Sequence, residues 1–393
     1  MSKDLTGKRP ETVLTHSGRD PHAYFGAVNT PVFRASTILS PTYADRKREK
    51  GEREPRYGRR GTPTTFTLED VLADIEGADG CIICPSGLSA ITTAILPFVS
   101  QGDHILMADC VYGPARNFAT KFLPRYGVST TFFDPRIGPD IAGLIQENTK
   151  VVYLESPGSL TFEVQDTPAI AAAAKKRGCI VMTDNTWATG LYFKPFELGC
   201  DVSIHAATKY IVGHSDAMLG AITCTKETYG PIREAWGLLG VAAPPDDVYL
   251  GTRGVRTMAV RLAQHHKNGL EVAHWLESRP EVARVLHPAL PSHPDHAIWQ
   301  RDFSGASGLF SFVMNPASEA QLEAYFDGLE LFGMGSSWGG YESLMTPNDP
   351  TDYRTATAWK AEGPLIRLHV GLENPADLIA DIEAGFGRMK ALA

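Results

Sequence analysis

The chain lacks the features that mark several classes of protein. None of its apolar runs approaches the roughly 20 residues that a transmembrane helix needs. The first twelve residues contain no apolar signal core, so no export is indicated. The net charge of -8 argues against a nucleic-acid-binding protein and against binding to an anionic membrane surface. We therefore expect a cytoplasmic protein with no nucleic-acid partner and no membrane association.

Cysteine is scarce, and its distribution excludes a disulfide-stapled fold. Six cysteines are scattered over 393 residues. The spacing of Cys81 and Cys84 could form half a zinc site or a redox pair, but no second pair with suitable spacing follows. Both residues lie in an apolar, strand-like run, so we interpret the cysteines as buried structural thiols in a reducing cytoplasm. No metal site is predicted.

Two nucleotide-binding motifs are also missing. Neither GxGxxG nor GxxxxGK followed by Ser or Thr occurs, so a dinucleotide or nucleoside-triphosphate enzyme loses its main support. The chain is 43% hydrophobic and 21% charged, which is ordinary for a soluble globular protein. Its 393 residues allow two or three cooperating domains.

The pattern along the chain predicts three regions. Residues 1–60 are rich in Pro, Gly and mixed charge, and we expect an extended arm that packs on a neighbouring subunit. Residues 61–258 alternate short apolar runs with helical segments, which predicts an α/β domain with a mostly parallel sheet. Residues 259–393 begin with a helix-like stretch and form a smaller α+β C-terminal domain. The predicted strands are 81–84, 105–108, 151–155, 180–184, 202–205, 221–224, 308–313 and 365–370, and a helix is predicted over 168–178 with Thr167 as its N-cap.

Glu155, Asp184 and Lys209 are supplied by the ends of three consecutive predicted strands of the α/β region. Parallel strands bring their C-terminal ends to one edge, where such sheets bind ligands. A buried lysine is costly unless it is paired or neutral, and a Schiff base with a carbonyl cofactor is the chemistry that lysine does best. Taken alone, Lys209 would be a surface lysine and Asp184 the N-cap of a turn. Together they favour a pyridoxal phosphate site, in which a carboxylate meets the cationic ring nitrogen.

A phosphate could be held where a predicted strand ends at Cys84 and a helix begins. Gly87 allows close approach of the backbone, and the amides of Gly87 and Leu88 can face the anion. Thr208 adds a hydroxyl group from the other side. A Ser-Gly pair at such a junction is often only a turn, so this motif gains its weight from Asp184 and Lys209.

Other candidate site residues are an aromatic side chain, an arginine and a glycine-rich loop. Tyr112 is either a partly buried core residue or stacks on a flat cofactor ring. Arg367 interrupts an apolar strand, where it either binds a carboxylate or forms a structural ion pair. The loop 336–343, which contains Ser337 and Trp338, could line the same cleft.

These motifs occur along nearly the whole chain in one order. They read YGRRGTPT from 57, PSGLSA from 85, LESPGS from 154, DNTWA from 184, ATKYIVGHSDAM from 207, RDFSGASGLFSF from 301, SSWGGYESL from 336 and LIRLHVGLE from 365. The set resembles the pyridoxal phosphate enzymes of cysteine and methionine metabolism, and within them the bacterial cystathionine β-lyases. LESPGS and the tryptophan of SSWGGYESL carry the resemblance to the β-lyase branch.

The resemblance implies a fold-type-I enzyme that assembles as a homotetramer, a dimer of dimers. It implies that Lys209 forms an aldimine with pyridoxal phosphate and that Lys209 and Tyr112 are catalytic. Tyr57 and Arg59 would come from the neighbouring subunit, and Ser337, Trp338 and Arg367 would bind the substrate. The remaining residues implied to bind the cofactor are Gly87, Leu88, Tyr112, Asp184 and Thr208.

The resemblance also implies the reaction, cleavage of cystathionine to homocysteine, pyruvate and ammonia. Two positions depart from the family pattern: Ala207 stands where many relatives have serine, and Gly237, beside Trp236, stands where related β-lyases have a tyrosine near the substrate. Several alternatives therefore stay open, namely a cystathionine γ-synthase or γ-lyase, a sulfhydrylase, a broad cysteine-S-conjugate β-lyase, and a ligand-binding protein that kept the fold without the activity.

Overall fold

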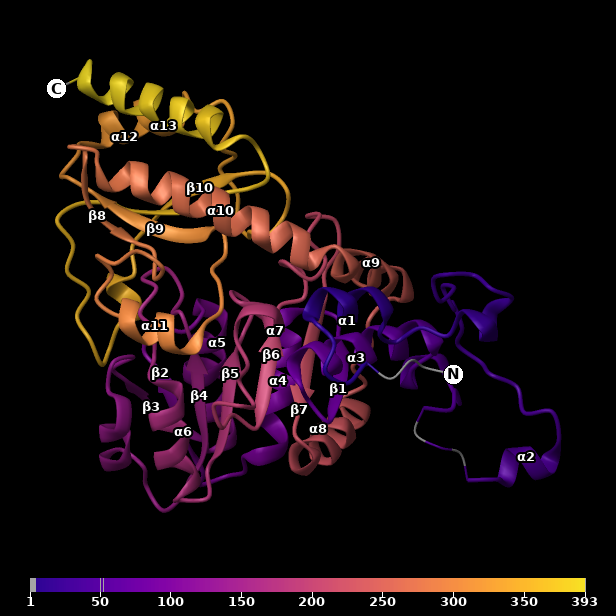
Figure 1. Ribbon diagram of the computed structural model, residues 1–393. Coiled ribbons are helices and arrows are strands. Elements are labelled where there is room, and N and C mark those ends of the chain that lie inside the picture. The colour runs from indigo at the N-terminus through magenta and orange to yellow at the C-terminus, as the bar shows by residue number, and fades with distance from the viewer. Residues whose placement is uncertain (1–4, 50, 52, 393) are drawn as a thin grey trace.

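The computed structural model describes residues 5–49, 51 and 53–392. A seven-stranded sheet forms the larger part of the molecule, and a four-stranded antiparallel sheet lies beside it (Figure 1). The expected α/β fold, with a mostly parallel sheet followed by a smaller α+β part, is confirmed. Among the described residues, we find no helix with the length and apolarity of a membrane span.

The larger sheet has the strand order β1-β7-β6-β5-β4-β2-β3. Within it, β7 runs antiparallel to both of its neighbours, and the other pairs are parallel. The edge strand β3 is missing from the sequence prediction because it begins with three polar residues, exposed or partly buried, and has no continuous apolar run. The strands are β1 (Gly80–Cys84), β2 (His104–Ala108), β3 (Ser129–Phe133), β4 (Thr149–Glu155), β5 (Ile180–Asp184), β6 (Val202–His205) and β7 (Gly220–Cys224).

Helices cover both faces of this sheet. Alternate residues of a strand point to opposite faces, so Ile82 and Cys84 of β1 pack with one set of helices and Cys81 and Ile83 with the other. One face carries α4 (Gly87–Ile95), α5 (Gly113–Asn117), α6 (Thr167–Lys175) and α8 (Lys226–Leu238), and the other carries α3 (Pro63–Glu76) and α9 (Pro245–Arg256), while the short α7 (Thr189–Tyr192) follows β5.

The N-cap of α6 differs from the sequence prediction. Thr167 is already the first residue of the helix, and the Asp166 side chain accepts a hydrogen bond from the Ala169 amide. Asp and Thr both accept such bonds, and the sequence alone did not fix which of the two neighbours does so. All six cysteines are free and buried, which confirms the prediction that the thiols are buried.

The smaller sheet has the order β10-β11-β9-β8. Its strands are β8 (Val282–Leu286), β9 (Leu309–Met314), β10 (Leu344–Asn348) and β11 (Leu365–His369), and the helices of this part are α10 (Met258–Glu277), α11 (His296–Asp302), α12 (Glu319–Phe326) and α13 (Pro375–Lys390). Figure 1 shows α10, α12 and α13 on one face of the sheet, turned away from the larger sheet. β10 contains Pro347, which an edge strand tolerates because it has one open side.

The faces of β11 explain where its polar residues lie. Ile366 and Leu368 pack with α10 and α13, whereas Leu365 packs with Trp187 of the larger domain. Arg367 and His369 alternate in step with Leu365, so both lie on the strand face turned toward the larger domain.

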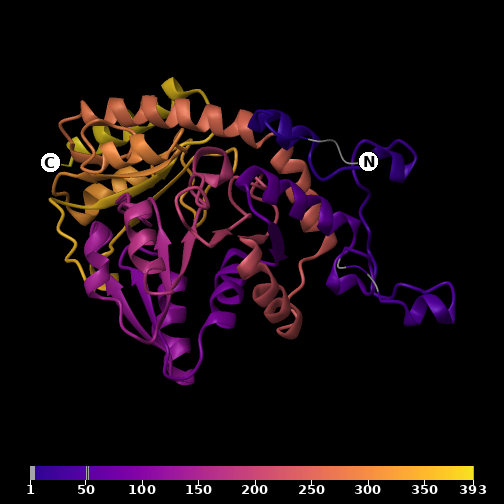
Figure 2. The same cartoon turned by 60° about the horizontal axis from the view of Figure 1, so that its bottom comes forward.

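The N-terminal segment forms an arm that leaves the body of the molecule on one side (Figure 2). It contains α1 (Pro10–His16) and the short α2 (Tyr43–Lys47) but no strand among its described residues. Large apolar side chains on the arm are exposed, including Phe25, Leu39 and Tyr43. Residues 1–4, 50 and 52 of the predicted arm lie outside the described residues.

Candidate active site

The carboxyl ends of three neighbouring strands form the floor of the candidate site. Glu155 and Asp184 end β4 and β5 and are register partners across the parallel pair. The sequence suggested that Lys209 lies at the end of a strand. In the structure β6 ends at His205, so Lys209 lies in the turn that follows the strand. In this turn the Lys209 amide donates to Ala206 O at 3.0 Å and the Gly213 amide donates to Lys209 O at 2.7 Å.

Asp184 is a buried carboxylate whose orientation is fixed by Thr186. The amide of Thr186 donates to Asp184 Oδ1 at 3.0 Å, and the Thr186 hydroxyl group donates to the same oxygen. The Thr186 oxygen in turn accepts the Ala206 amide at 2.9 Å, which ties the carboxylate to the turn that carries Lys209. Both hydrogen bonds from Thr186 end on Asp184 Oδ1, so Asp184 Oδ2 can accept from a further donor.

Glu155 links this floor to Tyr112. Its Oε2 accepts the Tyr112 amide at 2.7 Å, which fixes the turn after β2. Burial raises the pKa of Glu155 well above its ordinary value, and the neighbouring Asp184 raises it further. Burial raises the pKa of Asp184 as well, but the Thr186 hydrogen bonds and the charges of His205 and Lys209 oppose that rise. Glu155 therefore takes up a proton before Asp184 does, and Asp184 is the ionised member of the pair.

Lys209 is mostly buried and points toward the C-terminal domain. Its Nζ donates to Ser337 Oγ and lies 5.2 Å from the centre of the Trp338 ring. Burial lowers the pKa of Lys209 to about 8; the charge of Arg367 lowers it too, whereas Asp184 raises it. At pH 7 roughly a tenth of this amine is therefore neutral, far more than for an exposed lysine, and a proton-transferring lysine needs this neutral form.

Arg367 lies on β11 beside the same loop. Its Nη2 donates to the Ser337 carbonyl oxygen at 3.4 Å. Burial lowers the pKa of the guanidinium, but the group keeps its charge at any physiological pH. Tyr112 is 46% exposed. Partial burial raises the pKa of its hydroxyl group, the charges of Glu155 and Asp184 raise it further, and Arg367 lowers it, so Tyr112 lies near these charged residues.

The N-terminus of α4 faces the turn after β6. Ser86 is the N-cap and accepts the Ser89 amide at 3.1 Å, so the first amides of the helix, including those of Gly87 and Leu88, have no partner within it. A Cβ atom on Gly87 would lie 2.6 Å from the Cβ of Ala206, so only glycine fits there. The Thr208 hydroxyl group donates to Leu219 O at 3.1 Å, and it would have to exchange this bond to hold a phosphate.

The two departures from the family pattern have definite places in the structure. Ala207 is fully buried in the core cluster that includes Ile83 and Ala221, whereas Ala206 touches the phosphate-binding turn. A hydroxyl group at position 207 would therefore point into the core and not to a phosphate. Gly237 lies in α8, where an added Cβ would meet no atom within 4 Å, and its neighbour Trp236 is a core residue whose Nε1 donates to Ile83 O at 3.0 Å.

Tyr57 and Arg59 are not brought to Lys209 within one chain. Arg59 Nη1 donates to Gly237 O at 3.1 Å, and the Tyr57 hydroxyl oxygen accepts from Ser36 at 3.3 Å. Both residues line a cavity of about 290 Å³ at the base of the arm. The structure therefore separates them from Lys209, Asp184, Tyr112 and Arg367.

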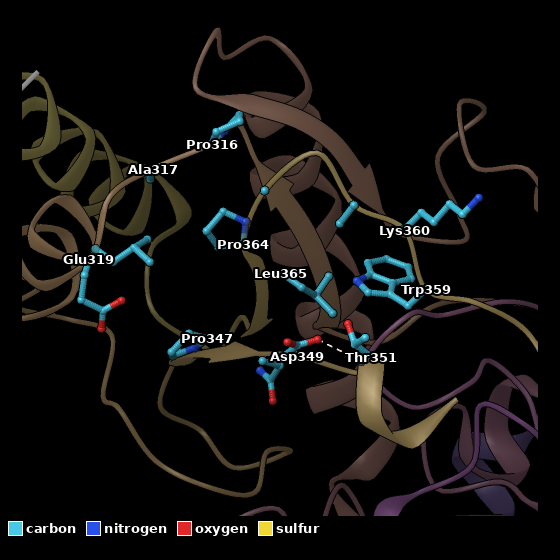
Figure 3. A pocket seen from close by; sticks show the side chains of 14 residues that line it. Pro316, Ala317, Glu319, Pro347, Asp349, Thr351, Trp359, Lys360, Pro364 and Leu365 are labelled. Carbon is cyan, nitrogen blue, oxygen red and sulfur yellow. Dashed lines mark hydrogen bonds between the residues drawn. The ribbon is translucent and has the colours of Figure 1, made fainter. Parts of the chain in front are cut away.

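A larger cavity lies on the C-terminal domain and is distinct from this site. It has a volume of about 910 Å³, and Figure 3 shows Pro316, Pro347 and Pro364 on its wall, with Trp359 and Lys360 at one side. None of its described lining residues is one of the predicted site residues. The group around Lys209 remains the candidate active site.

Comparison with known proteins identifies the family. Residues 11–387 match the model of the Cys/Met metabolism PLP-dependent enzymes. The chain belongs to this family. It is 47% identical to cystathionine beta-lyase MetC of Escherichia coli over 98% of this chain and all of that protein, and 46% identical to cystathionine beta-lyase of Salmonella typhimurium over the same shares. The crystal structure of metB from Corynebacterium glutamicum superposes with a TM-score of 0.90 at 28% identity, covering 100% of both chains.

Membership makes this protein an enzyme that depends on pyridoxal phosphate, and the site residues fit that group. Asp184 offers a buried carboxylate oxygen for a ring nitrogen, Tyr112 an exposed flat ring, and Lys209 a primary amine. The unpaired amides at the start of α4 suit an anion, and the backbone approaches there without a Cβ at Gly87. Asp184 therefore suits the ring nitrogen of the cofactor, Tyr112 its ring, Lys209 its aldehyde and the α4 amides its phosphate.

Sequence reasoning missed two residues that shape the site. Thr186 orients Asp184, and its signal is a hydroxyl group two residues after a strand-end aspartate. His369 lies two residues after Arg367 on the same strand face, and the alternation of β11 could have revealed it.

Proposed function

We propose that this protein is a carbon–sulfur β-lyase that cleaves cystathionine to homocysteine, pyruvate and ammonia. The observation that carries the proposal is the placement of Lys209, whose amine lies against Ser337 and beside the charges of Arg367 and Asp184. The full-length similarity to two cystathionine beta-lyases supports the choice of substrate.

Each residue has a task in this reaction. Arg367 and Ser337 bind the α-carboxylate of the substrate, with the planar guanidinium fork matching its two oxygens. The neutral Lys209 Nζ removes the proton from Cα and later donates it to the sulfur that leaves Cβ. Asp184 pairs the cofactor nitrogen, Tyr112 stacks on the cofactor ring, and the amides of Gly87 and Leu88 hold its phosphate. Bound pyridoxal phosphate supplies the electron sink for the charge left at Cα.

The test is product analysis with purified protein and three substrates, cystathionine, cysteine and methionine. We expect pyruvate from cystathionine and no 2-oxobutyrate, because β-elimination gives pyruvate and γ-elimination gives 2-oxobutyrate. Replacing Lys209 by alanine should lower the rate by at least 10²–10⁴-fold, roughly the share of a single proton-transfer group. A Lys209→Ala protein that released pyruvate at the wild-type rate would contradict the assignment.

The same experiment separates the alternatives. Production of 2-oxobutyrate would indicate a γ-lyase or γ-synthase, and faster turnover of cysteine than of cystathionine would indicate a broad cysteine-S-conjugate β-lyase. A cofactor-bound protein that releases neither product would indicate a sulfhydrylase, which needs sulfide and an activated hydroxyamino acid as substrates. A colourless, unreactive protein would indicate a ligand-binding role without activity.

We also propose that the enzyme is a cytoplasmic homotetramer, with an arm over residues 1–60, a cofactor domain over 61–258 and a C-terminal domain over 259–393. Six buried free thiols suit a reducing compartment. The exposed aromatic and aliphatic side chains of the arm suit burial against another subunit, which would bring Tyr57 and Arg59 to its site.

Subunit mixing tests this assembly. Lys209→Ala and Arg59→Ala subunits are each expected to be inactive, but a mixed oligomer contains sites with both residues intact, so activity should return on mixing. No recovery in a mixed oligomer of tetrameric mass would refute the shared site.

A further inference from the structure

The loop 336–343 contains a strained serine. Ser337 and Gly339 both have a φ of 86°, in the left-handed region. Glycine adopts this conformation freely, but a serine does so only where surrounding contacts impose it. Contacts from outside the loop therefore hold Ser337, whose hydroxyl group accepts from Lys209.

Two side chains of β11 supply such contacts. Arg367 Nη2 donates to Ser337 O at 3.4 Å, and His369 Nε2 lies 3.0 Å from Gly340 O. The turn between these two bonds packs on the backbone of Lys209, because a Cβ on Gly339 would lie 2.9 Å from the Lys209 carbonyl carbon. One strand face thus fixes both ends of the turn that presents Ser337.

His369 is itself held firmly. It is 1% exposed, and its ring centre lies 5.2 Å from that of His265 and 5.9 Å from that of Tyr210. Burial lowers the pKa of His369 to about 3, so the ring is neutral and carries a single N–H. Because Gly340 O is an acceptor, that hydrogen is on Nε2 and the histidine donates.

Tyr210 extends this packing to the reacting lysine. It follows Lys209 in the chain, is fully buried, and lies 5.4 Å from the Trp338 ring centre. The Tyr210 hydroxyl oxygen accepts the Gly308 amide at 3.1 Å, which fixes the ring at its far end. His369 and Trp338 therefore both pack against the Tyr210 ring, which joins β11 and the loop to the residue after Lys209.

We propose that His369 is a positioning residue for substrate binding: its Nε2–H bond to Gly340 O keeps Ser337 in the orientation that receives the α-carboxylate. This inference rests on the proposed function, which assigns Ser337 and Arg367 to that carboxylate. His369 acts through the loop, and its loss weakens substrate binding more than it slows chemistry.

The test compares four holoenzymes, the wild type and the variants His369→Phe, His369→Gln and His369→Asn. Phenylalanine keeps an aromatic ring and removes the hydrogen-bond donor. Glutamine places an amide nitrogen near the Nε2 position, whereas the shorter asparagine side chain does not reach that position. Glycine is the probe, since it carries the carboxylate and has no sulfur to lose, and its affinity is read from the cofactor absorbance. We expect a roughly 2- to 10-fold weaker affinity for glycine in the Phe and Asn variants, the effect of one hydrogen bond, and recovery in Gln. KM for cystathionine should rise in parallel while kcat changes less.

The matched control is His287→Phe. His287 is also fully buried and packs on Phe310, with ring centres 5.1 Å apart, but it follows the edge strand β8, which β9 separates from β11. Wild-type glycine affinity in folded His369→Phe, or an equal loss in His287→Phe, would overturn the inference. If His369→Phe does not fold, the comparison of His369→Gln with His369→Asn decides. Equal glycine affinities in these two variants would overturn the inference. Glycine binding does not depend on the lyase reaction, so a failed β-lyase assay leaves this test intact.

Discussion

Removing the amine of Lys209 is expected to stabilise the cofactor-free protein while it destroys activity. Methionine has a similar length and no charge, so Lys209→Met relieves the burial of an ammonium group. The pKa of Lys209 falls from its ordinary 10.5 to about 8 in the folded protein. This difference corresponds to about 3 kcal/mol of destabilisation when the amine is charged in both states. Loss of the hydrogen bond to Ser337 offsets about 1 kcal/mol of the gain.

The pH dependence of this gain has a definite sign. Below pH 8 the amine is charged in the folded and unfolded states, so the whole penalty applies and Lys209→Met should gain about 2 kcal/mol. Between pH 8 and 10.5 the unfolded chain binds more protons than the folded chain, so wild-type stability rises relative to the variant. Above pH 10.5 the penalty is gone and only the lost hydrogen bond remains, so the variant should be about 1 kcal/mol less stable.

Urea unfolding of both cofactor-free proteins at equal protein concentration measures the difference. We compare pH 7 with pH 10 and use Lys121→Met, a change at an exposed lysine, as the control. A Lys209→Met protein that is no more stable than wild type at pH 7, or a difference that does not change with pH, would refute the reasoning.

Two further predictions concern buried charges. Arg367→Lys keeps the charge and loses the fork, so kcat/KM for cystathionine should fall about 10- to 150-fold, which corresponds to a charged hydrogen bond of about 1.5–3 kcal/mol; an unchanged value would exclude a bidentate carboxylate contact. Asp109→Ala leaves Arg116 buried without its partner at 2.9 Å, so urea unfolding should show a loss of about 3–5 kcal/mol. Asp246→Ala removes an exposed ion pair and should change stability little, and equal losses in both variants would contradict this account.

The central strands of the larger sheet could be predicted from the sequence because burial favours apolar residues along them. Central strands such as β5 and β6 are buried on both faces, so branched and apolar residues predominate in them, and both have the predicted bounds. The edge strands β3, β8 and β10 were missed. One side of each is open, and their patterns are interrupted by Ser and Thr in β3, by a charged arginine in β8 and by Pro in β10.

The site was predictable in composition and less so in geometry. Asp184, Lys209 and Arg367 are costly in apolar surroundings, so each is visible as an exception in the sequence. The contact between Lys209 and Ser337 joins segments 128 residues apart, and no local pattern encodes it. The sequence also does not show which way each residue of a turn faces. Ala206 and Ala207 are both alanines, but Ala206 faces the phosphate-binding turn and Ala207 faces the core.

The site concentrates positive charge, whereas the chain as a whole is negative. This difference accounts for the anionic ligands that the site suits. The protein carries a net charge of -8. Within the site, Arg367 and the protonated fraction of Lys209 are cationic, Asp184 is the ionised carboxylate, and Glu155 takes up a proton first because of its burial beside Asp184. Protonation of Glu155 shifts the balance of the site toward positive charge, and the amides at the start of α4, which have no partner within the helix, add to it. An acidic surface with a cationic cleft concentrates small anions where the field is focused. A phosphate and an amino-acid carboxylate are the two anions that the cofactor and the substrate bring, so the placement of Glu155 beside Asp184 serves binding as well as chemistry.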